Sequence, residues 1–311
     1  MTNILYFDTS SGVSGDMFVG ALIDVGADIE IIRKHIASLG LEGFCVRARK
    51  VSKNGLMGTK FDVLDPHTGR DVDAPAEISH GHGHKHKHDH GHDHGHDHGH
   101  DHDHGHEHGH NHGHGDRHQH DHVMNNSHQH QRGLWEIGSI ICQSDLPQQV
   151  KDDAVAVFKL LAVAEAKVHG TTLEEVHFHE VGALDCIVDI VSAASAFHQL
   201  NIDETWCSPV HVGSGTVRCA HGILPVPAPA TMELLQGVPI YSTEVKGELV
   251  TPTGAALIRH FSRGFAPMPQ MIVERVGYGA GSKDFGIPNL LRATIGKMVE
   301  TVMPVPLAQD L

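Results

Sequence analysis

Histidine has the most regular spacing of any residue in this chain. The 311 residues contain 32 histidines, and 23 of them fall within residues 80–130. From His80 to His114 every even-numbered residue is a histidine. Alternate side chains of an extended segment project to one side about 7 Å apart, so imidazoles can converge on one ion when the chain bends. Flexible sets of imidazoles bind Ni²⁺, Cu²⁺ and Zn²⁺ without choosing sharply among them.

We therefore predict that this His-rich tract (residues 80–130) captures metal ions as a buffer or delivery arm, because a flexible segment cannot hold a reacting geometry. The alternative is a pH-responsive or solvated linker. Its only aliphatic or sulfur-containing apolar side chains are Val123 and Met124, too few to offset the entropy of ordering it. The histidines assigned to metal capture are His80, His82, His84, His86, His88, His90, His92, His94, His96, His98 and His100.

A tighter set of possible ligands lies in the block HFHEVGALDCIVD, which begins at residue 177. Two histidines would point to one side of a strand at 176–179, and two aspartates four residues apart would share one face of the following helix. Imidazoles and carboxylates at such a junction suit a divalent ion with open positions. The alternative is a polar surface with carboxylates that favour a helix start. The predicted metal ligands here are His177, His179, Glu180 and Asp189.

The loop DTSSGVSGD, residues 8–16, could bind an anion. Its glycines permit a tight turn, its serines offer hydroxyls, and the helix that follows supplies free N–H groups. An ordinary capped turn is the alternative, and the loop is not a P-loop because no Gly-Lys-Ser/Thr follows. Similar Gly- and Thr-rich turns occur near residues 213–216, 251–254 and 277–281, the last followed by Ser282 and Lys283. Together they favour a cleft for an anionic small molecule. The residues assigned to it are Asp8, Ser11, Gly12, Ser14, Gly15, Asp16, Gly213, Gly215, His221, Thr251 and Thr253.

Strands and helices must position these residues, and their patterns alternate along the chain. Apolar runs predict strands and 3.6-residue periodicity predicts helices. The alternation indicates an α/β or α+β fold, with a mixed sheet or sheets and flanking helices, interrupted by a long disordered His-rich insertion. The predicted strands are 3–7, 44–51, 58–64, 176–179, 271–279 and 290–296. The predicted helices start at Met17, cover 29–39, 134–143, 147–168, a part of 183–199 and 229–236, and run from Thr253 as cap to Gly264 as stop.

The helices on either side of the tract suggest that it loops out of one domain, since loop-closure entropy rises only logarithmically with length. We expect an N-terminal α/β part at 1–65 and a flexible linker containing the tract at 66–133. The α/β core continues over 134–300, and 301–311 is a tail.

Composition excludes several classes of protein. With 38 acidic against 23 basic residues the formal charge is −15, and no Lys/Arg cluster is present to neutralise nucleic-acid phosphates. No run of about 18 apolar residues predicts a membrane helix, and the first residues do not look like a secretory signal. The five cysteines are scattered, which argues against disulfides or a Cys-type zinc site. We expect a cytoplasmic protein that contacts neither nucleic acid nor membrane.

Five segments together resemble the LarC family of nickel insertion proteins, which assemble the nickel-pincer nucleotide cofactor of lactate racemase. An internal His-rich tract also resembles that family. The similarity runs through nearly all of the residues outside the tract. The segments are YFDTSSGVSGDMFVGALIDVG, HFHEVGALDCIVDIVSA, HVGSGTVRCAHGILPVPAPAT, ELVTPTGAAL and GYGAGSKDFGIPNLLR.

The resemblance implies a nickel chelatase or cyclometallase of the lyase class. Its reaction places Ni²⁺ in pyridinium-3,5-bisthiocarboxylic acid mononucleotide, forming two Ni–S bonds and one Ni–C bond. A base beside the metal must then remove the ring proton, and His179, Glu180 and Asp185 are the residues we expect to be catalytic. CTP with Mn²⁺ or Mg²⁺ is the implied co-substrate, and lactate racemase or a related apoenzyme is the implied downstream partner.

Family members continue into a further domain that handles CTP. We expect this domain to be absent from the present chain, so that either a separate polypeptide supplies it or this member carries out only the nickel-handling part. Two other functions stay open on the residues alone. One is a non-catalytic nickel metallochaperone or nickel store, and the other is a nucleotide-binding protein of unrelated activity.

Overall fold

The computed structural model describes residues 2–72, 132–176, 178, 184–219 and 221–299. The His-rich tract, the tail and the predicted ligands His177, His179 and Glu180 lie outside these described residues.

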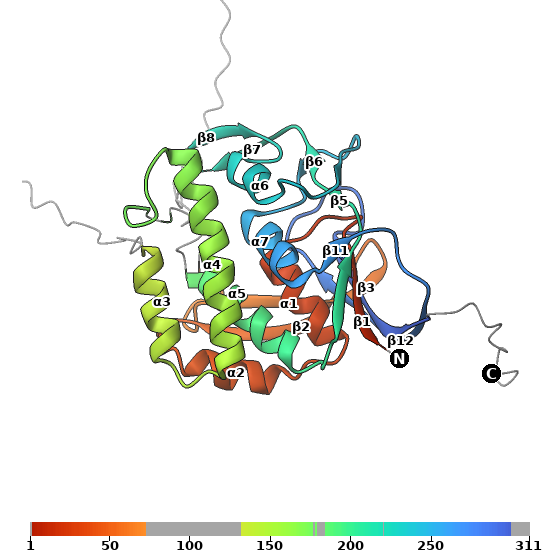
Figure 1. The fold of residues 1–311 in the computed structure, drawn as a ribbon, viewed down its shortest axis with the longest axis horizontal. Coiled ribbons are helices and arrows are strands. Elements are labelled where there is room, and N and C mark those ends of the chain that lie inside the picture. Colours follow the sequence, from red (N-terminus) through yellow and green to blue (C-terminus); the bar gives the residue numbers. More distant parts are fainter. Residues whose placement is uncertain (1, 73–131, 177, 179–183, 220, 300–311) are drawn as a thin grey trace, which may run out of the picture. The chain divides into compact units, whose positions relative to one another are not determined.

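A seven-stranded mixed sheet forms the framework, with strand order β11-β4-β1-β13-β12-β3-β2 (Figure 1). β13 runs antiparallel to both β1 and β12, whereas β12 is parallel to β3 and β1 is parallel to β4. The sheet therefore joins strands from both sides of residues 73–131. Its strands are β1 (Asn3–Asp8), β2 (Cys45–Lys53), β3 (Leu56–Leu64), β4 (Glu204–Cys207), β11 (Gly264–Phe265), β12 (Met271–Ala280) and β13 (Leu290–Met298).

The remaining strands of the described residues form three small two-stranded sheets. They pair β5 (Val210–His211) with β9 (Ile240–Tyr241), β6 (Gly213–Ser214) with β10 (Gly247–Glu248), and β7 (Thr216–Cys219) with β8 (Gly222–Pro225). The predicted mixed α/β architecture with flanking helices is confirmed. Sequence periodicity did not reveal β4, β7 or β8, because strands of four residues are too short to show it.

Helices pack on the sheet and on one another. α1 lies against β12, β3 and β13, and α5 packs against α1, α2, α4 and α7. Phe18 of α1 stands between Phe7 of β1 and Phe261 of α7, with ring centroids 4.7 and 5.7 Å away. The helices are α1 (Gly15–Asp24), α2 (Ile29–Ala37), α3 (Leu134–Gln143), α4 (Gln148–His169), α5 (Leu184–His198), α6 (Pro229–Leu234) and α7 (Pro252–Phe261).

Backbone-to-backbone contact brings α1 unusually close to the sheet. A Cβ atom on Gly279 of β12 would lie 1.8 Å from the carbonyl oxygen of Met17, and one on Gly20 of α1 would lie 2.3 Å from that of Thr59. Only residues without a side chain allow this approach. It holds the first turn of α1 against the end of β12, next to the loop predicted to bind an anion.

Two sequence predictions of local structure are wrong. α7 is capped by Thr251 and not by Thr253, because the Thr251 hydroxyl accepts the Gly254 N–H at 3.2 Å and Pro252 starts the helix. The described residues of the expected strand 176–179, Val176 and Phe178, are not in a strand. Their N–H groups bond to the carbonyls of Thr172 and Arg132 and not to a strand, although both side chains are buried.

Of the helices in the described part of the chain, none combines the length and the apolar character needed to cross a membrane.

The close approach of α1 to β12 is testable by thermal unfolding. Gly279→Ala should lower the free energy of unfolding by about 3 kcal/mol, because the new methyl group must push α1 away. Gly138→Ala in α3 is the matched control. Its methyl group meets nothing within 4 Å, and the change should raise stability by up to about 1 kcal/mol. Equal effects of the two substitutions on the free energy of unfolding would show that α1 does not approach β12 this closely.

Candidate functional site

A cavity of about 640 Å³ lies where the first turns of α1, α5 and α7 meet the end of α4, the β7–β8 hairpin and the loop after β12. Its volume suits a small organic molecule. Among the described residues that line it are side chains with acidic, basic, imidazole and thiol groups.

Lys60, which is buried, and Asp16, which is partly buried, form an ion pair in the wall of this cavity. The Lys60 Nζ lies 2.6 Å from Asp16 Oδ2 and also donates to the Phe61 carbonyl at 2.7 Å. The other Asp16 oxygen accepts the Met17 N–H at 2.8 Å and the Ser14 hydroxyl. The pair ties the first turn of α1 to β3, and it holds the Asp16 carboxylate in one orientation.

The charge of Lys60 is kept by its surroundings. Burial alone would lower the pKa of its ammonium group, but the carboxylates of Asp16, Asp62 and Asp189 outweigh burial and raise that pKa. Lys60 is therefore a fixed cation and not a base. Asp62 is held in turn by Arg49, whose Nε lies 2.9 Å from its carboxylate.

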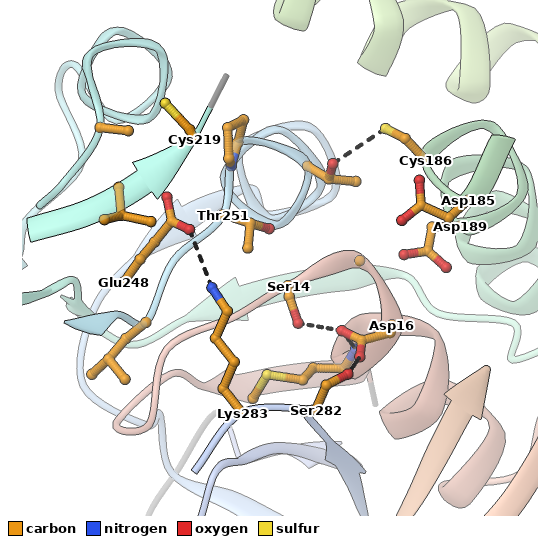
Figure 2. Close-up of a pocket in the computed structure, with 18 of the residues that line it drawn as sticks. Ser14, Asp16, Asp185, Cys186, Asp189, Cys219, Glu248, Thr251, Ser282 and Lys283 are labelled. Carbon is orange, nitrogen blue, oxygen red and sulfur yellow. Dashed lines mark hydrogen bonds and ion pairs between the residues drawn. The ribbon is translucent and has the colours of Figure 1, made fainter. Parts of the chain in front are cut away.

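Asp185 and Asp189 enter the cavity from the first turns of α5, one helical turn apart as the sequence spacing predicted. A Cβ atom on Gly15 would lie 2.3 Å from Asp189 Oδ2. Gly15 thus lets the start of α1 approach α5 closely. In this way carboxylates that are far apart in sequence gather on one side of the cavity (Figure 2).

The loops before α1 and α7 lie side by side. The Val13 N–H donates to the Leu249 carbonyl at 2.9 Å, and the Thr251 N–H donates to the Val13 carbonyl at 3.1 Å. Thr253 then faces α5, where its hydroxyl lies 3.2 Å from the Cys186 thiol. These contacts explain how separate Gly- and Thr-rich turns contribute to one cavity.

Glu248 and Lys283 lie on another side, apart from Asp185 and Asp189 (Figure 2). The Lys283 Nζ is 3.7 Å from Glu248 Oε2, and the lysine side chain is 57% exposed. This distance is longer than a charge-assisted hydrogen bond, so the ammonium group can also meet a ligand.

Imidazole and thiol groups also reach the cavity. His169 at the end of α4 packs against His221, with ring centroids 4.9 Å apart. Cys219, two residues before His221 in the sequence, also lines the cavity. Glu165, one turn before His169, lies 3.3 Å from its Nε2.

The structure brings together eight of the residues predicted from the sequence. The described cavity lining includes Ser14, Gly15, Asp16, Asp185, Asp189, His221, Thr251 and Thr253. Five other predicted residues are not among the described residues that line the cavity: Asp8, Ser11, Gly12, Gly213 and Gly215. Their assignment to a ligand stays a prediction.

For three of these five residues, structural contacts explain why an aspartate or a glycine stands at that position. Asp8 pairs with Arg292 across the β1–β13 ladder. Gly12 and Gly213 have positive φ angles of 83° and 81°, and each lies against the backbone of β10 or the residue after it. A Cβ atom on Gly12 would be 2.0 Å from the Leu249 carbonyl oxygen. Gly12 lets the loop before α1 pack beside β10, and Gly213 does the same for β6.

Sequence reasoning missed Lys60, Cys186, Cys219, His169 and Glu248 as parts of a site. The one available signal was in the strand GTKFDVL, where Lys60 and Asp62 interrupt an apolar run that the tertiary structure buries. Cys186 and Cys219 are close in sequence to the predicted residues Asp185 and His221, but their types gave no ligand pattern, and His169 is isolated in sequence; the packing of α4, α5 and β7 brings all three to the cavity.

Within the described ranges, no group of three or more His, Cys, Asp or Glu side chains is arranged to hold a metal ion. His177, His179 and Glu180 are outside those ranges, so their role as ligands stays a prediction.

Comparison with known proteins gives consistent matches. A family model described as "Nickel insertion protein" matches residues 5–306. Three relatives are each named pyridinium-3,5-bisthiocarboxylic acid mononucleotide nickel insertion protein. That of Desulfitobacterium hafniense (strain DSM 10664 / DCB-2) is 42% identical over 95% of this chain and 58% of its own length. Those of Geobacillus kaustophilus and Staphylococcus saprophyticus are 40% and 35% identical, over 94% and 97% of this chain and 60% and 62% of their own lengths.

The chain thus spans about three-fifths of the length of these relatives. No solved structure matches it.

The ion pair between Asp16 and Lys60 is testable by denaturant unfolding. Lys60→Met should lower the free energy of unfolding by about 2 kcal/mol, because it leaves the partly buried carboxylate of Asp16 without its cation. Lys167→Met is the matched control. Lys167 pairs with Glu233 but is 59% exposed, so its loss should cost less than about 1 kcal/mol. A loss for Lys60→Met no larger than that of the control would refute the structural role of the pair.

Proposed function

Because the chain belongs to the nickel insertion protein family, we propose that it inserts nickel into pyridinium-3,5-bisthiocarboxylic acid mononucleotide. The product is the nickel-pincer nucleotide cofactor of lactate racemase. The observation that carries the proposal is the cavity whose acidic side combines Asp16, Asp185 and Asp189. Its volume of about 640 Å³ suits a mononucleotide.

The reaction replaces a ring C–H bond by a Ni–C bond, and the two thiocarboxylate sulfur atoms also bind the metal. Nickel stays divalent, and the proton that leaves the ring must pass to a base, so no oxidant is needed. This chemistry makes the protein a nickel chelatase or cyclometallase of the lyase class.

Carboxylates on one side of the cavity suit both parts of this chemistry. They stabilise a dication and a cationic pyridinium ring, and one of them can accept the ring proton. We assign the base to Asp185 together with His179 and Glu180, and we assign the nickel ligands to Asp189, His177, His179 and Glu180. Lys60 keeps its positive charge and therefore holds Asp16 in place without taking part as a base.

CTP with Mn²⁺ or Mg²⁺ is proposed as co-substrate, with its site outside the cavity side chains assigned above. The His-rich tract would concentrate nickel for the cavity, and the finished cofactor would pass to lactate racemase or a related apoenzyme. A cytoplasmic location fits this role.

A nickel store is the second candidate, and the observation that favours it is the spacing of the 18 alternate histidines from His80 to His114. A store needs no ordered cavity, whereas an insertion enzyme does. The two predictions below separate these functions.

Asp185→Asn tests the catalytic assignment. Product formation from the mononucleotide, Ni²⁺ and CTP, in the presence of the CTP-handling domain, should fall at least about a hundredfold, because a proton acceptor is lost. Total nickel uptake should barely change, since one of 38 acidic residues is removed. Asp152→Asn, at an exposed position of α4, is the control and should keep the wild-type rate. Mass spectrometry of the product decides, and a fully active Asp185→Asn protein would remove Asp185 from the mechanism.

Deletion of residues 80–130 tests the role of the tract. Most of the bound nickel should be lost, because 23 of 32 histidines are removed. Product formation should nevertheless stay at the wild-type rate when Ni²⁺ is saturating, and should fall only when Ni²⁺ is scarce. Loss of all product at saturating Ni²⁺ would instead place the tract within the reaction, and normal behaviour at scarce Ni²⁺ would remove its delivery role.

A further inference from the structure

We infer that the cavity binds its nucleotide in one orientation, with the phosphate group at Lys283 and the pyridinium ring at Asp16, Asp185 and Asp189. This inference rests on the proposed function and adds to it the residue that recognises the phosphate.

Charge differs between the sides of the cavity. Asp185 and Asp189 lie on one side and Lys283 on another, where its ammonium group reaches into the cavity (Figure 2). Arg218 of β7 also lines the cavity, and β7 packs against β10, which carries Glu248, the partner of Lys283. Two cations therefore belong to the wall that includes Glu248.

Lys60, the lysine beside the acidic residues, already donates hydrogen bonds within the protein. Lys60 donates to Asp16 at 2.6 Å and to the Phe61 carbonyl at 2.7 Å, and its side chain is 9% exposed. A phosphate placed there would face carboxylates, whereas a pyridinium ring and a dication would be stabilised by the same carboxylates. A ligand with a cationic ring at one end and a phosphate at the other therefore fits in one direction.

The backbone of Lys283 is fixed, although its side chain is exposed. Its carbonyl oxygen accepts hydrogen bonds from Lys53 Nζ at 3.3 Å and from Asn289 Nδ2 at 3.0 Å. Lys53 also donates to the neighbouring Ser282 carbonyl at 3.2 Å. The side chain thus projects from an anchored position, and its 3.7 Å separation from Glu248 leaves it able to move onto a phosphate oxygen.

A phosphate in this place could come from the mononucleotide or from the triphosphate of CTP. The proposal commits to the mononucleotide, because the acidic side of the same cavity suits its pyridinium ring.

Calorimetric titration without nickel tests the orientation directly. The ligands are the mononucleotide, its dephosphorylated nucleoside and CTP, each added to wild type, Lys283→Gln and Lys283→Arg. Wild type should bind the mononucleotide at least about tenfold more tightly than the nucleoside. Lys283→Gln should remove most of this difference by weakening only the mononucleotide, and Lys283→Arg should restore it. Lys34→Gln, on α2 outside the cavity lining, is the control and should leave the binding of every ligand unchanged.

Equal weakening of mononucleotide and nucleoside by Lys283→Gln would mean that the residue only supports the cavity wall, and no weakening would mean that the phosphate lies elsewhere. Weakening of CTP binding without weakening of mononucleotide binding would assign Lys283 to the triphosphate. Each of these results overturns the inference. A wild-type protein that binds the mononucleotide but never accepts nickel into it would refute the proposed function alone, and one that does not bind the mononucleotide would refute both.

Discussion

The cavity depends on an ion pair between a strand and a helix start. Lys60 of β3 is buried, and its ammonium group is stabilised there chiefly by Asp16 at the first turn of α1. The buried ammonium group of Lys60 needs an anionic partner, and Asp16 provides the nearest one. The pair therefore requires α1 to begin where it does, and the glycines of α1 and β12 permit the short distance that the pair needs.

Other elements are positioned from that helix start. The loop before α1 hydrogen-bonds to the loop before α7, and Gly15 lets α5 bring Asp189 against the same turn. First turns of α1, α5 and α7 thus meet in one place, although α1 begins 169 residues before α5, and α5 begins 68 residues before α7. The result is a cavity with a fixed acidic side and with cations elsewhere on its wall, which is a suitable environment for a ligand with unequal ends.

The proposed function assigns two kinds of metal chemistry to this protein. Side chains of the His-rich tract are numerous and interchangeable, so they suit capture of nickel from solution. Cavity side chains are few and held by hydrogen bonds and ion pairs, so they suit a reaction in which one proton must leave one carbon atom. The proposed function connects the two, because insertion of nickel needs both a supply of metal and an ordered site.

Many of the helices, strands and site residues could be predicted from the sequence, because they depend on residues that are neighbours in the chain. The β1–loop–α1 opening and the spacing of Asp185 and Asp189 depend on hydrophobic periodicity and turn residues, which neighbouring positions determine. The five family segments are equally local. The pairing of Lys60 with Asp16 instead depends on a contact between segments 44 residues apart, and the choice of Thr251 as the cap of α7 accompanies the bond from its N–H group to the distant Val13 carbonyl. Tertiary structure alone decided which Gly-rich turns share a cavity, because burial and charge pairing act between residues that the sequence does not place together.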